Sequence, residues 1–522
     1  MFSDNLGAIL RTLDPRRAPT PRVHPARSAE HERAARRALT QEIRVPPLSE
    51  RLEKPEAYLA LQRQRRDALE ALLVAGEDGG CARTLDLICA ICEESRWAAG
   101  AGAPFEDEAH PEIDLQAADT AALLGWARCL RGEALDRRSG RIRARMLLEA
   151  RRRVIDPLLA QEDYLSSTAV LCAAATALIF LEDDPARLSL ALKPLLRMLE
   201  AAYACAQNAL EPLETRLDDA CAIADFAFVL HRVTAGATNL AGAVPYCAWL
   251  DELLFAHVED DWFFGCAEGV CRARVSGAAL YRLGALCGDD ALRALGARLH
   301  RVRALPSSTA TGRLLDVSLE EDLAALGAPA PRLKHAALED GRLMLARGAG
   351  FFCALSSGGN RANAGHFCVF VERAPVLVEG RFALPQLARP LSSPTPDWDF
   401  SDDGRAIMGV DVTPAYPQEA GIRAHQRTLL LAREDRGAQL VDVFDLTKPI
   451  EARYVFHTPY LPSFFDGGVR LGPMILTWEG EPETHARRLR LTPDFPEGLF
   501  EVALTYPHAE QRAMYTFFMR HA

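Results

Sequence analysis

Residues 341–357 read GRLMLARGAGFFCALSS, and near this stretch the hydrophobic pattern of the chain changes. Apolar residues upstream recur every three or four positions, as in YLALQRQRRDALEALLVAG at 58–76, which is typical of helices. From 341 onward, short apolar runs alternate with turn residues, which is typical of strands. The switch from a period of 3.6 to a period of 2 predicts a helical part followed by a sheet part.

Downstream of 341–357, further runs predict strands with turns between them. They include HFCVFVERAPVLVEG at 366–380, RTLLLAREDRGAQLVDVFDL at 427–446 and LFEVALTYP at 499–507, in which ERAP and REDRG are expected hairpin tips. A run of strands after a run of helices indicates separate domains. We therefore expect an α+β protein in which residues 334–522 form a separate domain of strands.

Residues 56–333 are expected to be helical almost throughout, with no strands. Many helices joined by short loops suggest stacked helical hairpins, and an incomplete (α/α) toroid satisfies this pattern. Residues 1–55 form an Arg- and Pro-rich lead-in, which we interpret as a strap lying on the helical domain. A basic nucleic-acid-binding tail is the alternative, but acidic residues are interleaved in it.

The composition is that of an ordinary globular protein. The chain has 522 residues, 49% of them hydrophobic and 25% charged, with a net charge of −11. This balance is not that of a nucleic-acid-binding protein. The positive charge is almost entirely Arg, which we attribute to codon bias in a GC-rich genome. Arg also binds carboxylates and sulfates with two parallel hydrogen bonds, so an anionic ligand remains compatible with this composition.

The compartment predicted from the sequence is the cytoplasm. The 13 cysteines have no regular spacing and favour a reducing environment over a disulfide framework. Cys89 and Cys92 form a CxxC pair at helical spacing, which is interpreted as two core thiols, with a redox or metal pair as the alternative. No apolar segment has the length of a membrane span, and the N-terminus does not resemble a secretory signal.

Several motifs, taken in order, resemble the heparinase II/III family. ICEESRW at 91–97 and PEIDLQAADTAALLGW at 111–126 are similar to its helical core. GNRANAGHFCVFVERAPVLVEG at 359–380 resembles a family segment that carries two histidines and an aspartate before two strands. The resemblance implies a toroid and a β-sandwich that face each other across a groove. It also implies β-elimination on uronic-acid polysaccharides, which needs a carboxylate neutraliser, a base and an acid.

The positions that would carry this chemistry are largely substituted. The family's two histidines and its aspartate fall on Gly359, Arg361 and Asn363, and a later His-Asn pair falls on Gly404 and Arg405. The acidic position after the second strand is retained as Glu379. Zinc needs about four converging N, S or O ligands, so we predict no zinc and no other cofactor.

The helical half departs from the family in the same way. The family's catalytic Tyr and the Trp after it fall near Asp218 and Asp219, whereas the preceding Glu is retained as Glu214. The Asp pair is explained either as an acid/base pair or, more simply, as a helix cap.

The remaining candidates each have a structural alternative. His366 could replace a lost base, or could simply be a packed strand residue. His457 is interpreted as structural. Arg361 and Arg381 could clamp a carboxylate, or form ion pairs. Trp97, like Trp126 and Trp262, could stack on sugars, or lie in the core.

Two hypotheses follow. In the first, the protein is a carbohydrate-binding or scaffolding pseudoenzyme that recognises acidic oligosaccharides or polysaccharides, with no nucleic-acid or membrane partner. In the second, it is an active lyase or hydrolase with a relocated site, for which His366, Arg361 and Glu214 are the candidates. The expected ligand-binding residues are Asn360, Arg361, Asn363, Arg381 and Trp97.

Overall fold

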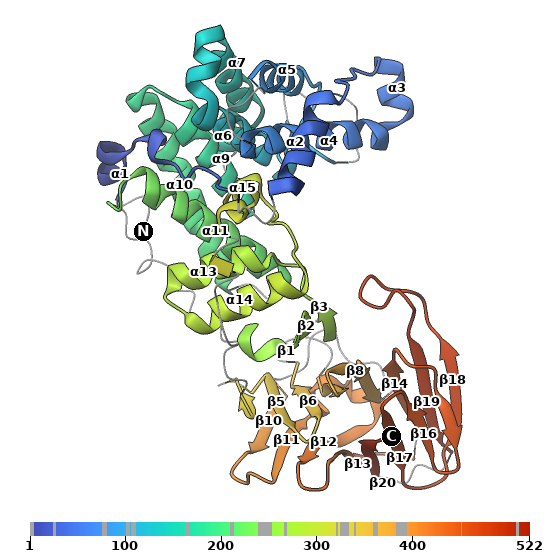
Figure 1. Ribbon diagram of the computed structural model, residues 1–522. Helices are drawn as coiled ribbons and strands as arrows, with labels where there is room; N and C mark the ends of the chain where they lie inside the picture. The colour runs from blue at the N-terminus through green and yellow to red at the C-terminus, as the bar shows by residue number, and fades with distance from the viewer. Residues whose placement is uncertain are drawn as a thin grey trace. The chain divides into compact units, whose positions relative to one another are not determined.

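The computed structural model describes the chain with short interruptions. The described residues are 5–23, 28–75, 81–100, 105, 111–161, 167–208, 213–237, 253–265, 269–319, 322–323, 333–338, 341–358, 364–382, 394–449, 451–507 and 511–522. They form two compact units. The first comprises Met1–Tyr246 and Arg274–Ala330, and the second comprises Cys247–Ala273 and Pro331–Ala522. The N-terminal part is therefore mainly helical and the C-terminal part rich in sheet, as the change of period predicts (Figure 1).

The first unit is built from helices of five to 24 residues. They are α1 (Leu6–Thr12), α2 (Ser28–Thr40), α3 (Leu48–Glu53), α4 (Pro55–Val74), α5 (Cys81–Cys92), α6 (Leu115–Arg138), α7 (Arg141–Ala150), α8 (Asp156–Ala160), α9 (Thr168–Leu181), α10 (Pro185–Asn208), α11 (Leu213–Val233), α13 (Gly277–Cys287), α14 (Asp290–Val302) and α15 (Ala310–Asp316). The five-residue α8 continues a π-helical turn, η4 (Arg151–Ile155), and the 3-10 turns η2 (Pro15–Arg17) and η5 (Val317–Leu319) lie near the two ends of the unit's sequence.

Helix α9 is the centre of the first unit. All of its 14 residues are buried, as expected for a helix that is apolar on every side. It contacts α6, α10 and α11. Gly125 of α6 allows the closest approach, because a Cβ there would lie 3.2 Å from Cβ of Phe180 and 3.3 Å from Cα of Ala177. The Ser167 side chain accepts a hydrogen bond from the Val170 amide and fixes the start of α9.

The motif ICEESRW forms the buried charged centre of this unit. Glu94 receives hydrogen bonds from Arg65 at 2.9 Å and from Arg66 at 2.8 Å. The Trp97 indole donates to the Ile91 carbonyl, and the Arg153 guanidinium lies 4.9 Å from the centre of its ring system. The residues that carry the family resemblance here therefore hold helices together.

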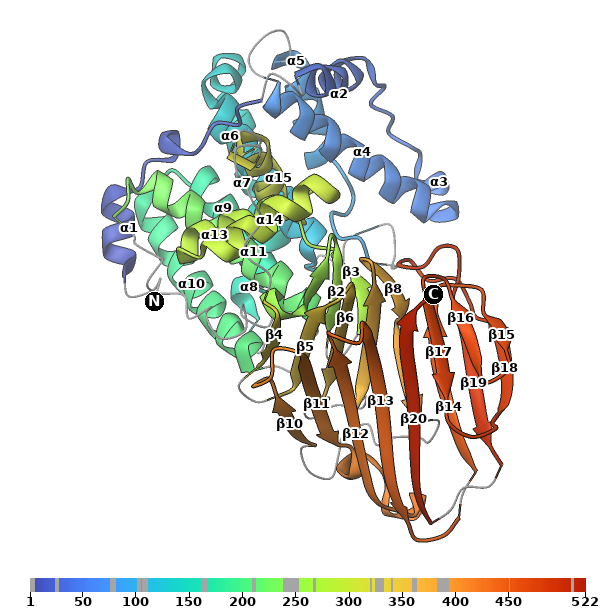
Figure 2. The same cartoon turned by 60° about the horizontal axis from the view of Figure 1, so that its bottom comes forward.

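The second unit contains three sheets that share one core. The largest has the order β10-β11-β12-β13-β20-β17-β16-β15, and the others have the orders β18-β19-β14-β9 and β4-β5-β6-β7-β8. All of the paired strands are antiparallel, and Figure 2 shows the long strands β11, β12, β13 and β20 side by side. The five-stranded sheet contacts β11, β12 and β13, and its apolar side chains pack with theirs in the shared core.

The strand bounds follow the predicted pattern closely. They are β4 (His335–Ala337), β5 (Leu343–Gly348), β6 (Phe351–Ser356), β7 (His366–Val371), β8 (Ala374–Leu377), β9 (Glu379–Phe382), β10 (Thr395–Asp399), β11 (Arg405–Asp411), β12 (Ile422–Ala432), β13 (Gly437–Leu446), β14 (Ala452–Thr458), β15 (Ser463–Phe465), β16 (Gly468–Leu471), β17 (Met474–Trp478), β18 (Glu483–Arg488), β19 (Phe500–Tyr506) and β20 (Arg512–His521). The 3-10 turns η6 (Thr413–Ala415) and η7 (Gln418–Ala420) lie between β11 and β12.

One segment corrects the expectation that residues 56–333 contain no strands. Strands β1 (His257–Glu259), β2 (Trp262–Gly265) and β3 (Gly269–Arg272) form a small antiparallel sheet that belongs to the second unit. Asp260, with φ at +48°, makes the turn between β1 and β2, and an aromatic run follows it. The Trp262 ring stacks on Phe495 with centroids 5.2 Å apart, so this sheet gains its stability from residues far along the chain.

Candidate functional site

The four-stranded sheet of the second unit presents polar side chains on the face away from the core. On β14, Tyr454 and Phe456 belong to the shared core. Because side chains alternate along a strand, Arg453, Val455 and His457 lie on the opposite face. On β9, a Cβ at Gly380 would meet the Phe367 ring at 2.2 Å, so Gly380 faces the core. Its neighbour Glu379 therefore lies on the same outer face as His457.

Three residues form a row across neighbouring strands of this outer face. His457 is paired in register with Glu379 of β9 on one side and with Glu501 of β19 on the other. Nδ1 of His457 lies 2.8 Å from Glu379 Oε2, and Nε2 lies 3.8 Å from Glu501 Oε2. The His457 side chain is 13% exposed and that of Glu501 only 5%. We call Glu379, His457 and Glu501 the carboxylate–histidine row.

Two arginines hold the far end of the row. Arg487 of β18 donates two hydrogen bonds to Glu501, at 2.9 and 2.7 Å, and Arg453 lies 3.5 Å from the same carboxylate. The hydrogen bonds from Arg487, aided by its charge, lower the pKa of Glu501 below its ordinary value. Glu501 is therefore an anion at neutral pH. Glu379 contacts the other ring nitrogen, so a carboxylate faces each nitrogen of the imidazole.

A buried arginine fixes the segments that lead into this face. Arg427 of β12 donates to the carbonyl of Gly365, just before β7, at 2.7 Å, and to that of Gly380 in β9 at 3.2 Å. Its other donors bind both oxygens of Asp442, at 2.8 and 2.7 Å. Although burial alone raises a carboxyl pKa, the adjacent Arg427 holds the pKa of Asp442 well below its usual range. Arg427 is therefore a positioning residue for the backbone beside Glu379.

The structure places His366, an expected base, under the small β1–β3 sheet. His366 is the first residue of β7, and its ring lies 5.4 Å from that of Phe264. A Cβ at Gly269 would meet the His366 ring at 2.6 Å, and the φ of +70° at this position also favours glycine. This packing favours the structural alternative for His366.

The other expected ligand-binding residues are only partly described. Asn360, Arg361 and Asn363 lie outside the described residues. Arg381 is in β9 with its backbone opposite Val455, and Glu214 is in the first turn of α11, but the side chains of both lie outside the described part. Their roles therefore remain predictions.

Trp97 is completely buried, which corrects its expected stacking role. Both Trp97 and Trp126 are 0% exposed, and the Trp126 indole donates to the Thr311 hydroxyl in the core. Trp262 is 8% exposed, between Phe495 and the Arg272 guanidinium. None of these three rings offers an open face to a sugar, because protein atoms cover them.

The aspartates at the family's catalytic Tyr-Trp positions lie within α11. The Asp219 carboxylate accepts a hydrogen bond from the amide of Ala169, in the first turn of α9, at 3.3 Å. It therefore satisfies one of the free amides at that helix start. This corrects the expected cap at a loop-to-helix junction: Asp219 lies inside α11 and contacts the start of α9, a structural contact rather than an acid/base arrangement.

The side chains that could bind a metal ion do not come together at one point within the described part of the chain. No group of three His, Cys, Asp or Glu residues there is arranged to hold a metal ion. In the carboxylate–histidine row, the two ring nitrogens of His457 face opposite carboxylates and do not converge. Burial raises the pKa of the Cys92 thiol to about 12, which disfavours the thiolate that metal or redox chemistry at Cys89 and Cys92 would need.

Sequence reasoning missed Glu501 and Arg487. Both lie in short C-terminal strands whose charged residues look like ordinary solvent-facing positions. The signal that was available is the alternation in EVALTY and ETHARR, which places Glu501 and Arg487 on one face once the two strands pair. The register itself depends on long-range pairing and cannot be read from either strand alone.

Comparison with solved structures shows which known fold this is. The Streptomyces coelicolor A3 chondroitin AC lyase in complex with chondroitin sulphate matches 99% of this chain and 83% of its own, at 12% identity and a TM-score of 0.53. Heparinase III matches 100% of this chain and 89% of its own, at 10% identity and a TM-score of 0.53. This chain has a heparinase II/III-like fold.

One further solved structure has a similar fold, and two other comparisons found no match. A Paenibacillus xanthan lyase matches 95% of the chain at 9% identity and a TM-score of 0.55, over 57% of its own length. No family model and no curated protein matches the sequence. Within the described residues, no helix of the heparinase II/III-like fold is both long and apolar enough to cross a membrane.

Proposed function

We propose that this protein is a carbohydrate-binding pseudoenzyme of the polysaccharide-lyase type, which recognises acidic oligosaccharides without β-elimination. The observation that carries the proposal lies at Asp218 and Asp219, near which the family's catalytic Tyr and the Trp after it fall; the second of these two aspartates has a structural contact. The Asp219 carboxylate caps α9 through the Ala169 amide. A side chain used to stabilise a helix start is not available as the base that the reaction needs.

The architecture proposed with this function is the one that the family resemblance implies. It consists of an incomplete (α/α) toroid over residues 56–333 and an antiparallel β-sandwich over 334–522, preceded by the lead-in 1–55. The two-unit organisation and the shared core of the sheets support it, with β1–β3 as an addition to the second unit. The free thiols among the described cysteines support a cytoplasmic protein.

We propose that Asn360, Arg361 and Asn363, with Arg381, recognise the acidic group of the saccharide. A guanidinium and two amides hold carboxylates and hydroxyls but do not accept a proton at neutral pH. Removing one charged hydrogen-bonding group costs about 1.5–3 kcal/mol, so Arg361→Ala is expected to weaken binding about 10- to 100-fold. Calorimetric titration with uronate oligosaccharides measures this, with Arg470→Ala, an exposed change on β16, as the control.

A second candidate function is an active lyase with a relocated site. The carboxylate–histidine row favours it, because Glu379 and His457 form a hydrogen-bonded acid–base pair on an outer sheet face. In this alternative His457 moves the proton, and Glu379 holds its ring.

One pair of measurements separates the two functions. Absorbance near 232 nm reports the unsaturated uronate formed by β-elimination, and calorimetry reports binding on the same substrates. Binding with no rise in absorbance supports the pseudoenzyme. A rise that is lost in His457→Ala but kept in His485→Ala, an exposed histidine on β18, establishes the lyase instead. Failure to bind any acidic saccharide contradicts both proposals.

A further inference from the structure

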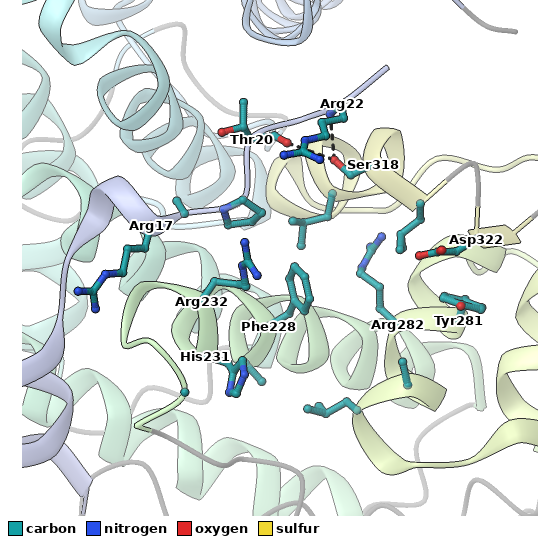
Figure 3. A pocket seen from close by; sticks show the side chains of 18 of the residues that line it. Arg17, Thr20, Arg22, Phe228, His231, Arg232, Tyr281, Arg282, Ser318 and Asp322 are labelled. Carbon is teal, nitrogen blue, oxygen red and sulfur yellow. Dashed lines mark hydrogen bonds between the residues drawn. The ribbon is translucent and has the colours of Figure 1, made fainter. Parts of the chain in front are cut away.

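The first unit contains a large cavity between its N-terminal lead-in and several of its helices. Its volume is about 1020 Å³, comparable with the pockets that hold small organic ligands. Four segments line it: the lead-in at 16–22, the C-terminal half of α11, helix α13, and α15 with η5 and the residues after it (Figure 3). All of them belong to the first unit.

The lead-in forms one wall of the cavity and is tied down at both ends. The Asp14 amide donates to the Val233 carbonyl at the end of α11, at 2.8 Å. At the other end, the Arg22 amide donates to the Ser318 hydroxyl at 3.1 Å, and that hydroxyl donates in turn to the Thr20 carbonyl (Figure 3). The wall is therefore anchored by backbone hydrogen bonds, which supports the interpretation of the lead-in as a strap.

The lining is strongly basic. Five of the described lining residues are Arg, and one, Asp322, is acidic. Some of this charge is already used: Arg16 binds Asp14 at 3.0 Å, and the buried Arg282 lies 2.6 Å from both Asp225 and Asp316. For Arg22 and Arg232 the structure gives no ion pair with any described residue. These two cations are available to a ligand.

An apolar surface lies directly beside the free cations. Phe228 is 38% exposed, and it stands four residues before Arg232, so both side chains lie on one face of α11. Figure 3 shows both directed toward the strap. Leu286, Leu315 and Leu319 extend the apolar lining. The combination suits a ligand with an anionic group on an apolar ring, because a ring packs on Phe228 while the guanidiniums bind the anion.

Helix geometry separates this cavity from the family's catalytic position. Arg232 and Asp218 are 14 residues apart on α11, which corresponds to roughly 21 Å at 1.5 Å per residue. The C-terminal end of α11 carries a partial negative charge of about half a unit, which opposes an anion. The full charges of Arg22 and Arg232 outweigh it, and the Asp14 amide already binds one of the terminal carbonyls.

We propose that this cavity is a binding site for a small organic anion, a carboxylate, sulfate or phosphate attached to an apolar ring. Arg22 and Arg232 bind the anionic group, and Phe228 contacts the ring. The site is independent of the saccharide recognition proposed for the second unit.

Calorimetric titration of the full-length protein with phenyl phosphate tests the site. We expect one molecule bound per chain, with affinity reduced about 10-fold or more in Arg232→Gln and in Arg22→Gln, since each removes a charge-assisted hydrogen bond. Phe228→Ala is also expected to weaken binding. Arg187→Gln, an exposed arginine on α10 that is paired with Asp184, is the matched control.

Two further ligands distinguish the contributions of charge and ring. Inorganic phosphate is expected to bind more weakly than phenyl phosphate, and phenyl glucoside, which has the ring without the charge, is expected not to bind. Circular dichroism verifies that each variant keeps its helical content. Equal affinity of the wild type, Arg232→Gln and Arg22→Gln for phenyl phosphate would overturn the proposal, as would the absence of binding to the wild type.

Discussion

At the scale of single residues, the second unit depends on one buried ion pair. Arg427 and Asp442 are 3% and 0% exposed, and Arg427 also holds the carbonyls of Gly365 and Gly380. Such a pair adds little net stability compared with apolar residues, but a partner left alone in the core is costly. The same arginine orders the backbone next to Glu379, so its loss affects both stability and the outer sheet face.

Arg427→Met is expected to lower the free energy of unfolding by about 3–5 kcal/mol, because it leaves the Asp442 carboxylate buried without its counter-ion. Adding Asp442→Asn removes that charge and should recover a large part of the loss. Urea denaturation of the wild type, the single variant and the double variant measures this. A double variant less stable than Arg427→Met would show that the uncompensated charge is not the main cost.

A neighbouring histidine makes stability depend on pH. His425 is 1% exposed, its Nδ1 lies 3.1 Å from the Tyr416 hydroxyl, and its Nε2 lies 3.3 Å from Asp442 Oδ1. Burial lowers the pKa of His425 below its ordinary 6.5, although Asp442 opposes that shift and Arg427 favours it. The folded protein therefore keeps the ring neutral where the unfolded chain takes up a proton.

The contribution of His425 to stability is thus complete above pH about 6.5 and is lost as the pH falls through the lowered pKa. We expect the difference in melting temperature between the wild type and His425→Gln to shrink from pH 7.5 to pH 5. Thermal unfolding at several pH values measures it, with the exposed His485→Gln as the control. A difference that stays constant over this range would contradict the assignment.

At the scale of elements, helices α13 and α14 pack backbone to backbone through glycines. A Cβ at Gly296 would lie 2.5 Å from the Tyr281 amide nitrogen and 2.7 Å from the Gly277 carbonyl oxygen. A Cβ at Gly277 would lie 2.4 Å from the Gly296 carbonyl oxygen. Because these neighbours are backbone atoms, they cannot move aside without separating the two helices.

Gly296→Ala is therefore expected to destabilise the protein by about 1–3 kcal/mol, despite the higher helix propensity of alanine. Gly132→Ala in α6 is the matched control, because the nearest atom to its Cβ is an Arg128 side-chain carbon at 3.9 Å. That change should stabilise by about 0.5–1 kcal/mol. Chemical denaturation measures both, and equal effects of the two changes would refute the close packing of α13 and α14.

The elements also show what the sequence could predict. The hairpin tips at ERAP and REDRG are found between β7 and β8 and between β12 and β13, because local turn residues determine them. The strands at 257–272 were not predicted, because each has too few residues to show a clear alternation of apolar and polar side chains. They are stabilised by packing of Trp262 on Phe370 and Phe495, which are distant in the sequence. The carboxylate–histidine row was missed for the same reason: its register is set by pairing between strands, not by any one strand.

At the scale of the whole molecule, each unit is discontinuous in sequence. The second unit takes Cys247–Ala273 from within the first. Arg347 donates to the His257 carbonyl at 2.8 Å, and Trp262 packs against Phe370 and Phe495. A boundary drawn at residue 333 therefore removes part of the second unit.

A fragment spanning 331–522 should unfold at a lower temperature than the same fragment fused through a Gly/Ser linker to 253–273, because the outer faces of Phe370 and Phe495 lose their apolar cover. Differential scanning calorimetry compares the two. A fusion in which Trp262 is replaced by alanine serves as the control and should melt between them. Identical melting of all three would mean that the inserted sheet contributes nothing to the second unit.

This interleaving of the units has a consequence during protein synthesis. The aromatic run at 262–264 leaves the ribosome about 100 residues before β7, whose Phe370 it packs against. At about 5–20 residues per second, it waits roughly 5–20 s without its partner. The first unit is also incomplete when this run appears, because α13, α14 and α15 follow the run in the sequence. The nascent chain thus carries an aromatic strand without its apolar partners during this interval, and we expect ribosome-associated chaperones to bind it there; crosslinking of nascent chains stalled near residue 340, compared with a Trp262→Ser variant, measures this.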